Sequence, residues 1–372
     1  MSKFVESISY DKDLKRAAGI AIEQVLAVGE GESVLIVSNP DDNVRRISEA
    51  VFNASVEVGG RTSLIFQEPK TQVDFAEDTV VKALESNPDV FISVSRHKLG
   101  KDRFRIGNPI SEGGKEYDHI FTYLWKTKRL RSFWSPSITT EMFSETVPID
   151  YEELRTNARK LKEILDKAES VHVTAKAGTD VKIGLAGRTT HLDDGDFRQP
   201  GRGGNLPAGE VYVSPELESS KGTIVYDGSI SAHKGVIVIR DPIKVMVEEN
   251  SITEIRGSTE AKALENALEV SVETAREMVK RGSLTKEQSE EYIKGARCLG
   301  ELGIGLNQKA KIVGNMLEDE KVYGTCHIAI GSNYDEDIKS FTHLDGLIWY
   351  PTITASYPDG SQETIMRDGK LA

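Results

Sequence analysis

The segment Ser33-Val-Leu-Ile-Val-Ser38 decides how the first part of the chain folds. Its central residues are all apolar, Gly31 precedes it, and Asn39-Pro40 follows it. A short, continuous apolar run between turn residues is typical of a strand that is buried on both faces of a parallel sheet. The sequence therefore predicts a parallel sheet around this strand.

The residues on either side of this segment alternate between helix and strand patterns. Apolar residues recur at helical spacing over 11–29, and glycines end the pattern. After the strand we expect a helix near 42–58, a strand at 62–66, a helix near 74–86 and a strand at 89–94. Such alternation indicates βαβ units. No glycine-rich turn follows the first strand, which argues against a dinucleotide site and favours a scaffold domain.

A second domain is expected after an amphipathic helix at 151–168, for which Asp150 is the predicted N-cap. Beyond it the pattern changes to strands, and the runs 171–174 and 180–185 predict a hairpin. The predicted fold class is therefore α/β, with an N-terminal doubly wound βαβ domain at 1–150. An α+β, mostly antiparallel, catalytic domain is predicted at 151–372. The last expected elements before the chemically interesting region are strands at 222–226, 235–239 and 243–247, and helices at 258–281 and 285–298.

Composition excludes several classes of protein. The chain has 372 residues and a net charge of −12, which argues against a nucleic-acid partner because such binding depends on Lys and Arg. No apolar run approaches the length of a membrane span, and the N-terminus has no signal-peptide pattern. Cys298 and Cys326 have no partner at metal-binding or redox spacing, so we expect buried thiols in a cytoplasmic protein.

Potential metal ligands concentrate between Glu301 and Asp345. Histidines and carboxylates lie there in short β-like segments with interspersed glycines, and Glu210 follows an Asn/Pro/Gly loop earlier in the chain. His343 and Asp345 are two residues apart, which places both side chains on one face of a strand. The candidate ligands are Glu210, Glu301, Glu320, His327, His343 and Asp345. This set contains the carboxylates and histidines that a pair of metal ions requires.

A similar tripeptide occurs earlier, in His191-Leu-Asp193-Asp194-Gly-Asp196. The spacing does not match an EF-hand calcium loop, which needs a glutamate at its twelfth position. We interpret the segment as an Asp-rich turn, with contacts at the rim of a substrate site as the alternative.

The motifs resemble those of the M29 metallo-aminopeptidases, the aminopeptidase T family. The matching segments are Asn205-x-Pro207-x-Gly209-Glu210-Val211, Glu301-x-Gly303-x-Gly305-x-Asn307, Glu320 followed by Cys326-His327-Ile-Ala-Ile-Gly331, Tyr334, and His343-x-Asp345. Val322 occupies the position at which that family usually has a glutamate, and Glu320 aligns only with a two-residue insertion.

The resemblance implies a homodimeric hydrolase that binds two divalent ions (zinc, cobalt or manganese) and removes N-terminal amino acids from peptides. It implies that Glu210, Glu301, His327, His343 and Asp345 bind the metals. Glu301 would bridge the ions or activate water, and Tyr334 would stabilise the tetrahedral intermediate.

Two alternatives remain open from the sequence. His327, His343 and Asp345 alone form the two-histidine, one-carboxylate set of non-haem Fe(II) oxygenases, and the dihydroxypyridine ring-cleaving dioxygenases resemble this chain with that subset. A single iron does not need Glu210 and Glu301, so these carboxylates favour the peptidase. A catalytically silent metal-binding protein is the third hypothesis, against which Tyr334 argues.

Overall fold

The computed structural model describes residues 12–71 and 74–372, which form two compact units. The first unit extends to Arg155 and also contains Asp193–Ala208, whereas the second contains Thr156–Leu192 and Gly209–Ala372. The sequence predicts a single boundary at residue 150. The structure instead returns the chain to the first unit, because the short strand β10 (Gly203–Asn205) pairs with the sheet of that unit.

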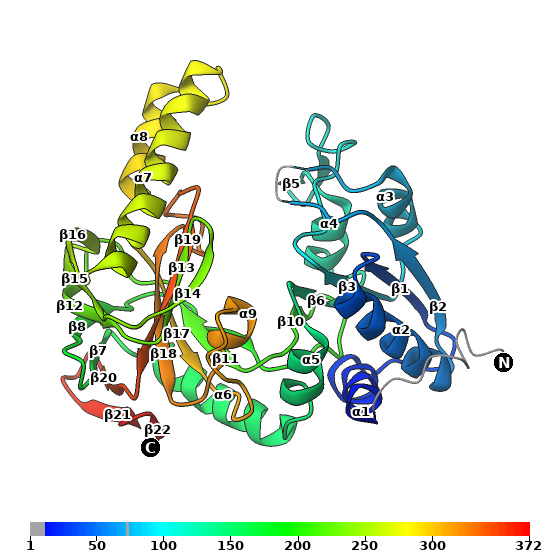
Figure 1. Cartoon of the computed structure of the whole chain (residues 1–372), viewed down its shortest axis with the longest axis horizontal. Helices are drawn as coiled ribbons and strands as arrows, with labels where there is room; N and C mark the ends of the chain where they lie inside the picture. Colours follow the sequence, from blue (N-terminus) through cyan, green and yellow to red (C-terminus); the bar gives the residue numbers. More distant parts are fainter. Residues whose placement is uncertain (1–11, 72–73) are drawn as a thin grey trace. The chain divides into compact units, whose positions relative to one another are not determined.

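The first unit is built on a five-stranded parallel sheet with the strand order β10-β6-β3-β1-β2 (Figure 1). The apolar run from Ser33 to Ser38 is β1, which lies inside the sheet between β3 and β2. The strands are β1 (Ser33–Ser38), β2 (Arg61–Phe66), β3 (Val90–Ser95), the small hairpin β4 (Ile110–Glu112) and β5 (Lys115–Tyr117), β6 (Arg131–Pro136) and β10. The predicted doubly wound domain is confirmed.

Helices flank this sheet. The predicted helix at 11–29 is α1 (Lys12–Ile20), which continues as a π-helix, η1 (Ala21–Leu26). Residue 11 lies outside the described residues. The other helices are α2 (Asp42–Glu57), α3 (Asp78–Glu85), α4 (Ile120–Lys126) and α5 (Thr140–Thr146). At the ends of β1 and β3 the Asn39 side chain donates to the Gln67 carbonyl at 2.8 Å and accepts from the Arg96 amide at 2.7 Å.

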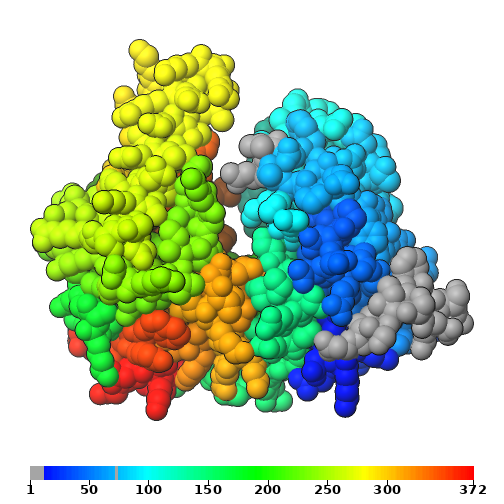
Figure 2. All heavy atoms as spheres, in the orientation of Figure 1, coloured from blue at the N-terminus to red at the C-terminus, as the bar shows by residue number. Residues whose placement is uncertain are grey.

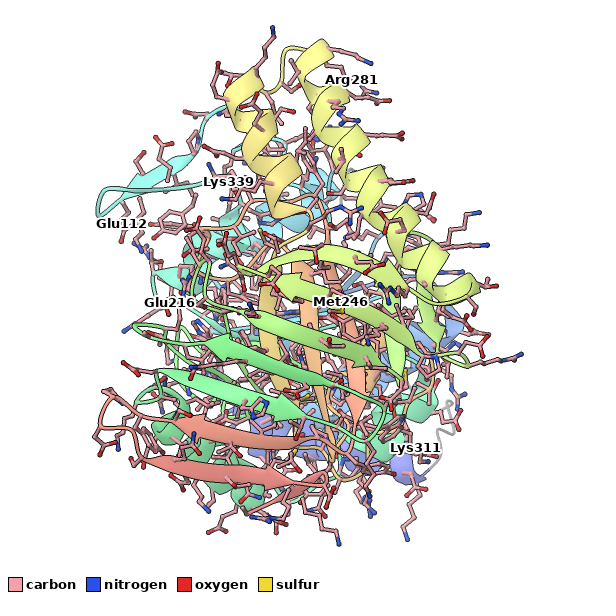
Figure 3. The ribbon with its side chains drawn as sticks, turned by 90° about the vertical axis from the view of Figure 1, so that its left-hand side faces the viewer. Glu112, Glu216, Met246, Arg281, Lys311 and Lys339 are labelled. Carbon is pink, nitrogen blue, oxygen red and sulfur yellow. The ribbon has the colours of Figure 1, made fainter. Side chains whose placement is uncertain are left out.

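The second unit contains two antiparallel sheets. The seven-stranded sheet has the order β14-β13-β19-β18-β17-β11-β9, and the eight-stranded sheet has the order β16-β15-β12-β8-β7-β20-β21-β22. They lie one over the other in Figure 3, with Met246 on the eight-stranded sheet. Between them the buried Tyr226 hydroxyl donates to the Ile328 carbonyl at 3.0 Å. The mostly antiparallel second domain is therefore confirmed.

The strands of the second unit begin and end as follows: β7 (Ser170–Thr174), β8 (Asp180–Gly184), β9 (His191–Asp193), β11 (Glu210–Val213), β12 (Lys221–Tyr226), β13 (Ser229–Ala232), β14 (Gly235–Val238), β15 (Ile243–Glu248), β16 (Ser251–Arg256), β17 (Leu299–Gly305), β18 (Thr325–Gly331), β19 (His343–Trp349), β20 (Thr352–Ser356), β21 (Gln362–Arg367) and β22 (Lys370–Leu371). The predicted hairpin of the first two is present.

The helices include α6 (Tyr151–Leu165), which leads into this unit, and the short α9 (Met316–Asp319). Asp150 caps α6 as predicted, because its carboxylate accepts from the Glu152 and Glu153 amides at 3.0 Å. Helices α7 (Thr259–Lys280) and α8 (Lys286–Gly295) form a projecting arm, seen in Figure 2. A capping box at Thr285 begins α8.

No helix within residues 12–71 and 74–372 combines the length and the hydropathy that a bilayer-spanning segment requires. Both cysteines are buried and unbridged.

Candidate metal centre

The candidate ligands come from four neighbouring strands of the seven-stranded sheet. Glu210 begins β11, Glu301 lies in β17, His327 lies in β18, and β19 begins with His343-Leu-Asp345. The register pairs Ala329 of β18 with both Glu301 and Asp345. Residues that face each other across antiparallel strands, and residues two apart along a strand, share one face of the sheet. The strand pairing therefore directs all these side chains to the same face.

Gly303 makes room for His327 on this face. The two residues are paired across β17 and β18, and a Cβ atom added at Gly303 would lie 1.9 Å from Nε2 of His327. A Cβ atom at Gly305 would lie 2.2 Å from the Val322 carbonyl oxygen. The glycines of the Glu301-x-Gly303-x-Gly305 motif therefore allow close approach of β18 and of the segment before it.

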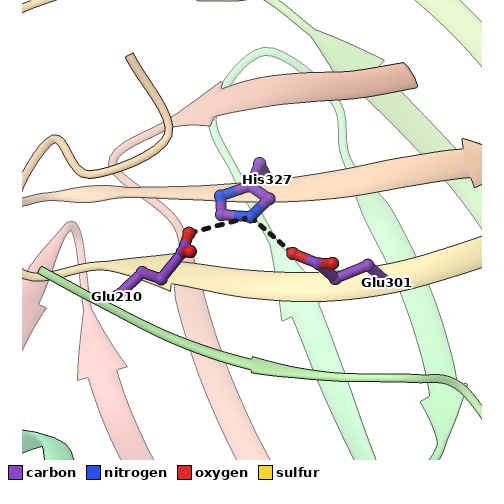
Figure 4. A group of neighbouring side chains, drawn as sticks. All are labelled: Glu210, Glu301 and His327. Carbon is purple, nitrogen blue, oxygen red and sulfur yellow. Dashed lines mark hydrogen bonds and ion pairs between the residues drawn. The ribbon is translucent and has the colours of Figure 1, made fainter. Parts of the chain in front are cut away.

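Two groups of three side chains could each hold a metal ion. One contains Glu210, Glu301 and His327, the other contains Glu301, His343 and Asp345, and within each the ligand atoms lie within 4.8 Å of one another. Figure 4 shows both glutamates directed at Nε2 of His327. The Oε1 atom of Glu301 is 2.9 Å from that nitrogen, and an Oε2 atom of Glu210 is 3.6 Å from it.

Glu301 links the two groups. Its second oxygen, Oε2, is 3.5 Å from Nε2 of His343, and Oδ1 of Asp345 is 3.1 Å from the same nitrogen. The other nitrogen of His343, Nδ1, donates to the Ser332 carbonyl at 2.7 Å. Such a bond fixes the ring and leaves Nε2 as the nitrogen that can bind a metal.

Two carboxylate oxygens at this centre have no hydrogen-bond partner among residues 12–71 and 74–372. They are Oε2 of Glu210 and Oε2 of Glu301, both of them buried. Buried polar atoms are normally hydrogen-bonded, and imidazole with carboxylate oxygen is a donor set for divalent transition metals. The residues therefore fit a divalent metal ion.

The charges in the cluster depend on one another. Burial acts to lower the pKa of His327, but its hydrogen bond to Glu301 prevails and raises the pKa to about 9. Burial likewise acts to lower the pKa of His343, but the charge of Asp345 prevails and raises that pKa to about 10. Burial acts to raise the pKa of Asp345, yet His343 lowers that pKa to about 2. Without metal both imidazoles hold a proton at neutral pH, so a metal ion must displace those protons.

Glu320, a predicted ligand, belongs to neither group. It is the C-cap residue that follows α9, and its Oε1 atom accepts from the Lys321 ammonium at 2.7 Å. The same ammonium is 2.5 Å from Oε1 of Glu210. Sequence reasoning missed Lys321, because a lysine beside a glutamate ordinarily indicates a solvated surface. The sequence around it, Glu318-Asp-Glu-Lys321, is charged and gives no signal of burial apart from its nearness to the predicted ligands.

The segment that carries Lys321 is fixed by the buried Asp319. Its carboxylate accepts from the Val313 amide at 2.8 Å, the Gly314 amide at 3.2 Å and the Ser229 hydroxyl at 2.7 Å. The Lys321 carbonyl also accepts from the Asn307 amide at 2.8 Å. The backbone beside the cluster is therefore held from several directions.

Aromatic rings border the cluster, and we call Tyr334, Tyr212 and His191 the aromatic shelf. The centroids of the tyrosine rings are 4.8 Å apart, and those of His191 and Tyr212 are 5.3 Å apart in a stacked arrangement. The Tyr334 ring meets the His343 ring edge to face at 5.8 Å. Of these residues only Tyr334 was singled out from the sequence, although His191 was considered as a rim residue.

The oxygenase set predicted from the sequence is not one compact group. No group within the described ranges brings both histidines together with Asp345 inside the 4.8 Å limit. Each group instead pairs one histidine with Glu301, which makes Glu301 the centre of the cluster.

The fold is shared with known enzymes. The structure of 2,5-dihydroxypyridine dioxygenase from Pseudomonas putida KT2440 superposes with a TM-score of 0.71 at 18% identity, covering 98% of each chain. AmpT from Thermus thermophilus gives a TM-score of 0.66, also at 18% identity, covering 98% of this chain and 100% of that one. The chain thus has the fold of these two proteins, and the aminopeptidase T resemblance holds at the level of the fold.

The family is defined more narrowly by sequence. The chain belongs to the NicX family, described as 2,5-dihydroxypyridine 5,6-dioxygenase, whose family model matches residues 137–324. A curated 2,5-dihydroxypyridine 5,6-dioxygenase from Pseudomonas putida is 29% identical over 124 residues, which are 33% of this chain. The match spans 35% of that relative.

Proposed function

We propose that this protein is a metal-dependent dioxygenase that opens a hydroxylated, planar ring of the dihydroxypyridine type. The single observation that carries the proposal is the aromatic shelf beside the cluster, in a chain of the NicX family. The ring of Tyr334 lies 5.8 Å from that of His343, and the residue is 57% exposed although it borders buried carboxylates.

An exposed aromatic face next to metal ligands suits a flat substrate. Aromatic rings prefer offset or edge-to-face contacts at centroid separations of about 4.5–7 Å, and the rings of the shelf already adopt such contacts with each other. A substrate ring stacked on Tyr334 would have its edge at the cluster.

The chain's own residues supply binding and proton handling. Glu301, His343 and Asp345 would hold the metal, with His327 on the other side of Glu301. A redox-active divalent ion such as iron, when bound, supplies Lewis acidity and the one-electron chemistry that dioxygen requires. In this proposal Glu301 would accept a proton from a ring hydroxyl. The Ser332 carbonyl accepts from Nδ1 of His343 and keeps that ring in position.

Oxygen uptake tests the proposal. Protein loaded anaerobically with Fe(II) is mixed with 2,5-dihydroxypyridine, and oxygen consumption and loss of ring absorbance are followed together. We expect both signals, with an increased KM in Tyr334→Ala. Tyr350→Ala is the matched control, because Tyr350 is also 57% exposed but lies elsewhere, packed on Trp349. Absence of oxygen uptake with several hydroxylated pyridines would contradict the proposal.

A metallo-aminopeptidase is the second candidate, and one observation favours it. Glu301 belongs to both groups and directs a different oxygen to each histidine, as a carboxylate that bridges two ions would. In that case Glu301 would accept the proton of the attacking water and Tyr334 would donate to the oxyanion. Release of an aminoacyl-anilide's amine, abolished by EDTA, would support this candidate over the oxygenase.

A further inference from the structure

We propose that the ammonium group of Lys321 occupies the place of a second metal ion, so that the centre binds one divalent ion per chain. The inference rests on the proposed metal centre and sharpens it, because one ion suits an oxygenase and two suit the aminopeptidase. It concerns a residue that the ligand motifs do not include.

Lys321 is enclosed by the cluster. Its side chain is fully buried, and Nζ contacts Oε1 of Glu210 at 2.5 Å and Oε1 of Glu320 at 2.7 Å. Lysine is almost never fully buried without anionic partners. Here the partners are two of the carboxylates that the sequence proposed as metal ligands.

The ammonium of Lys321 contacts a carboxylate that a second metal ion would also need as a ligand. Glu210 directs Oε1 to Lys321, while its Oε2 lies 3.6 Å from His327 in the group that Glu301 completes. An ion bound by Glu210, Glu301 and His327 would therefore share one carboxylate with the ammonium. Repulsion between two cations at such a separation is strong where water is excluded.

The lysine is also fixed in place. The amide of Lys321 donates to the Glu318 carbonyl at 3.0 Å, and its carbonyl accepts from the Asn307 amide at 2.8 Å. Asp319, whose carboxylate accepts from three backbone amides and the Ser229 hydroxyl, precedes it by two residues. The backbone at Lys321 is thus fixed, and its buried ammonium lies against Glu210 and Glu320.

The other side of Glu301 remains available. His343, Asp345 and Oε2 of Glu301 form the second group, which contains neither Glu210 nor Glu320, the carboxylates described above in contact with the ammonium. His343 has the orientation of a metal-binding imidazole, since its Nδ1 donates to Ser332. The single ion is therefore expected in this group.

Metal stoichiometry tests the inference. Full-length protein is stripped with a chelator and equilibrated anaerobically with excess Mn(II) or Fe(II). Unbound metal is then removed and the metal is counted by elemental analysis. Three chains are compared: the wild type, Lys321→Met, which keeps a long apolar stem but loses the charge, and Lys309→Met, an exposed lysine on the loop after β17.

We expect one ion per chain in the wild type and in Lys309→Met, and two in Lys321→Met, where Glu210 and Glu320 are left without the ammonium. Two ions in the wild type would overturn the inference, as would a single ion in folded Lys321→Met. Where Lys321→Met is unfolded without metal, its thermal midpoint should be restored by Mn(II), and failure of that rescue would also overturn it.

Oxygen uptake on the same samples separates this inference from the proposed function. One ion without oxygen uptake keeps the inference and refutes the proposed reaction. Two ions with oxygen uptake keep the reaction and refute the role of Lys321.

Discussion

Replacement of Glu301 by glutamine removes the charge at the centre of the cluster while it keeps the size of the side chain. Glu301 is 3% exposed, and its two oxygens lie 2.9 Å from His327 and 3.5 Å from His343. Both possible ligand groups contain this carboxylate, so the substitution removes a ligand whichever group binds the metal. We therefore expect a loss of metal affinity with a retained fold.

The magnitude follows from the contacts. A hydrogen bond to a charged group contributes about 1.5–3 kcal/mol, and a buried site stands at the upper end of that range. Loss of about 3 kcal/mol corresponds to an approximately 100-fold higher Kd for the metal. The charge of Glu301 also raises the pKa of His327, so that pKa should fall in the variant.

Competition with a chelating dye under anaerobic conditions measures the metal Kd, and thermal unfolding of the metal-free protein checks the fold. Glu49→Gln is the matched control, because Glu49 is also a buried carboxylate, paired with Arg45 at 2.8 Å in the first unit. Its Kd should equal that of the wild type. A Kd in Glu301→Gln within about twofold of the wild type would refute the central position of this carboxylate.

Three further outcomes are expected. Gly303→Ala should lose metal uptake, because its Cβ would lie 1.9 Å from Nε2 of His327. Gly107→Ala is the control and should retain uptake, because the space around Gly107 is open. Equal metal content in the two variants would contradict this prediction. Asp319→Ala removes the carboxylate that accepts from three amides and the Ser229 hydroxyl, so urea unfolding should show a loss of about 3 kcal/mol. An unchanged unfolding midpoint would contradict this role of Asp319. Metal binding should release protons, since the pKa values of His327 and His343 are raised to about 9 and about 10. The affinity should then rise from pH 6 to pH 8, and calorimetry in buffers of different ionisation enthalpy should reveal the release; a heat independent of the buffer would contradict it.

Much of the fold could be predicted because its signals are local. The apolar run of β1 and the helical spacing of α2 each predict their own secondary structure, and Asp150 is a recognisable N-cap at the start of α6. Strand β10 could not be predicted, because Gly203-Gly-Asn205 has no apolar pattern and pairs with β6 some seventy residues earlier. The sequence therefore predicts a single boundary between the units and does not show that residues 193–208 belong to the first unit.

The site could be predicted in part for a similar reason. His343-x-Asp345 and the glycine-spaced Glu301 motif have recognisable spacing, and the structure brings them together with Glu210 and His327. The contact of Lys321 with Glu210, which lies 111 residues away, depends on the whole sheet and leaves no pattern in the sequence. The stacking of His191 and Tyr212 across two strands is equally non-local. The sequence therefore indicates the ligands but not the features that decide between one ion and two.

The most direct test of the proposed reaction is incorporation of labelled oxygen. Iron-loaded protein is supplied with 2,5-dihydroxypyridine under ¹⁸O₂, and the product is analysed by mass spectrometry. A dioxygenase inserts both atoms of dioxygen, so the account predicts a ring-opened product that carries both labelled atoms. An unchanged pyridine, together with EDTA-sensitive release of amino acids from peptides, would contradict it.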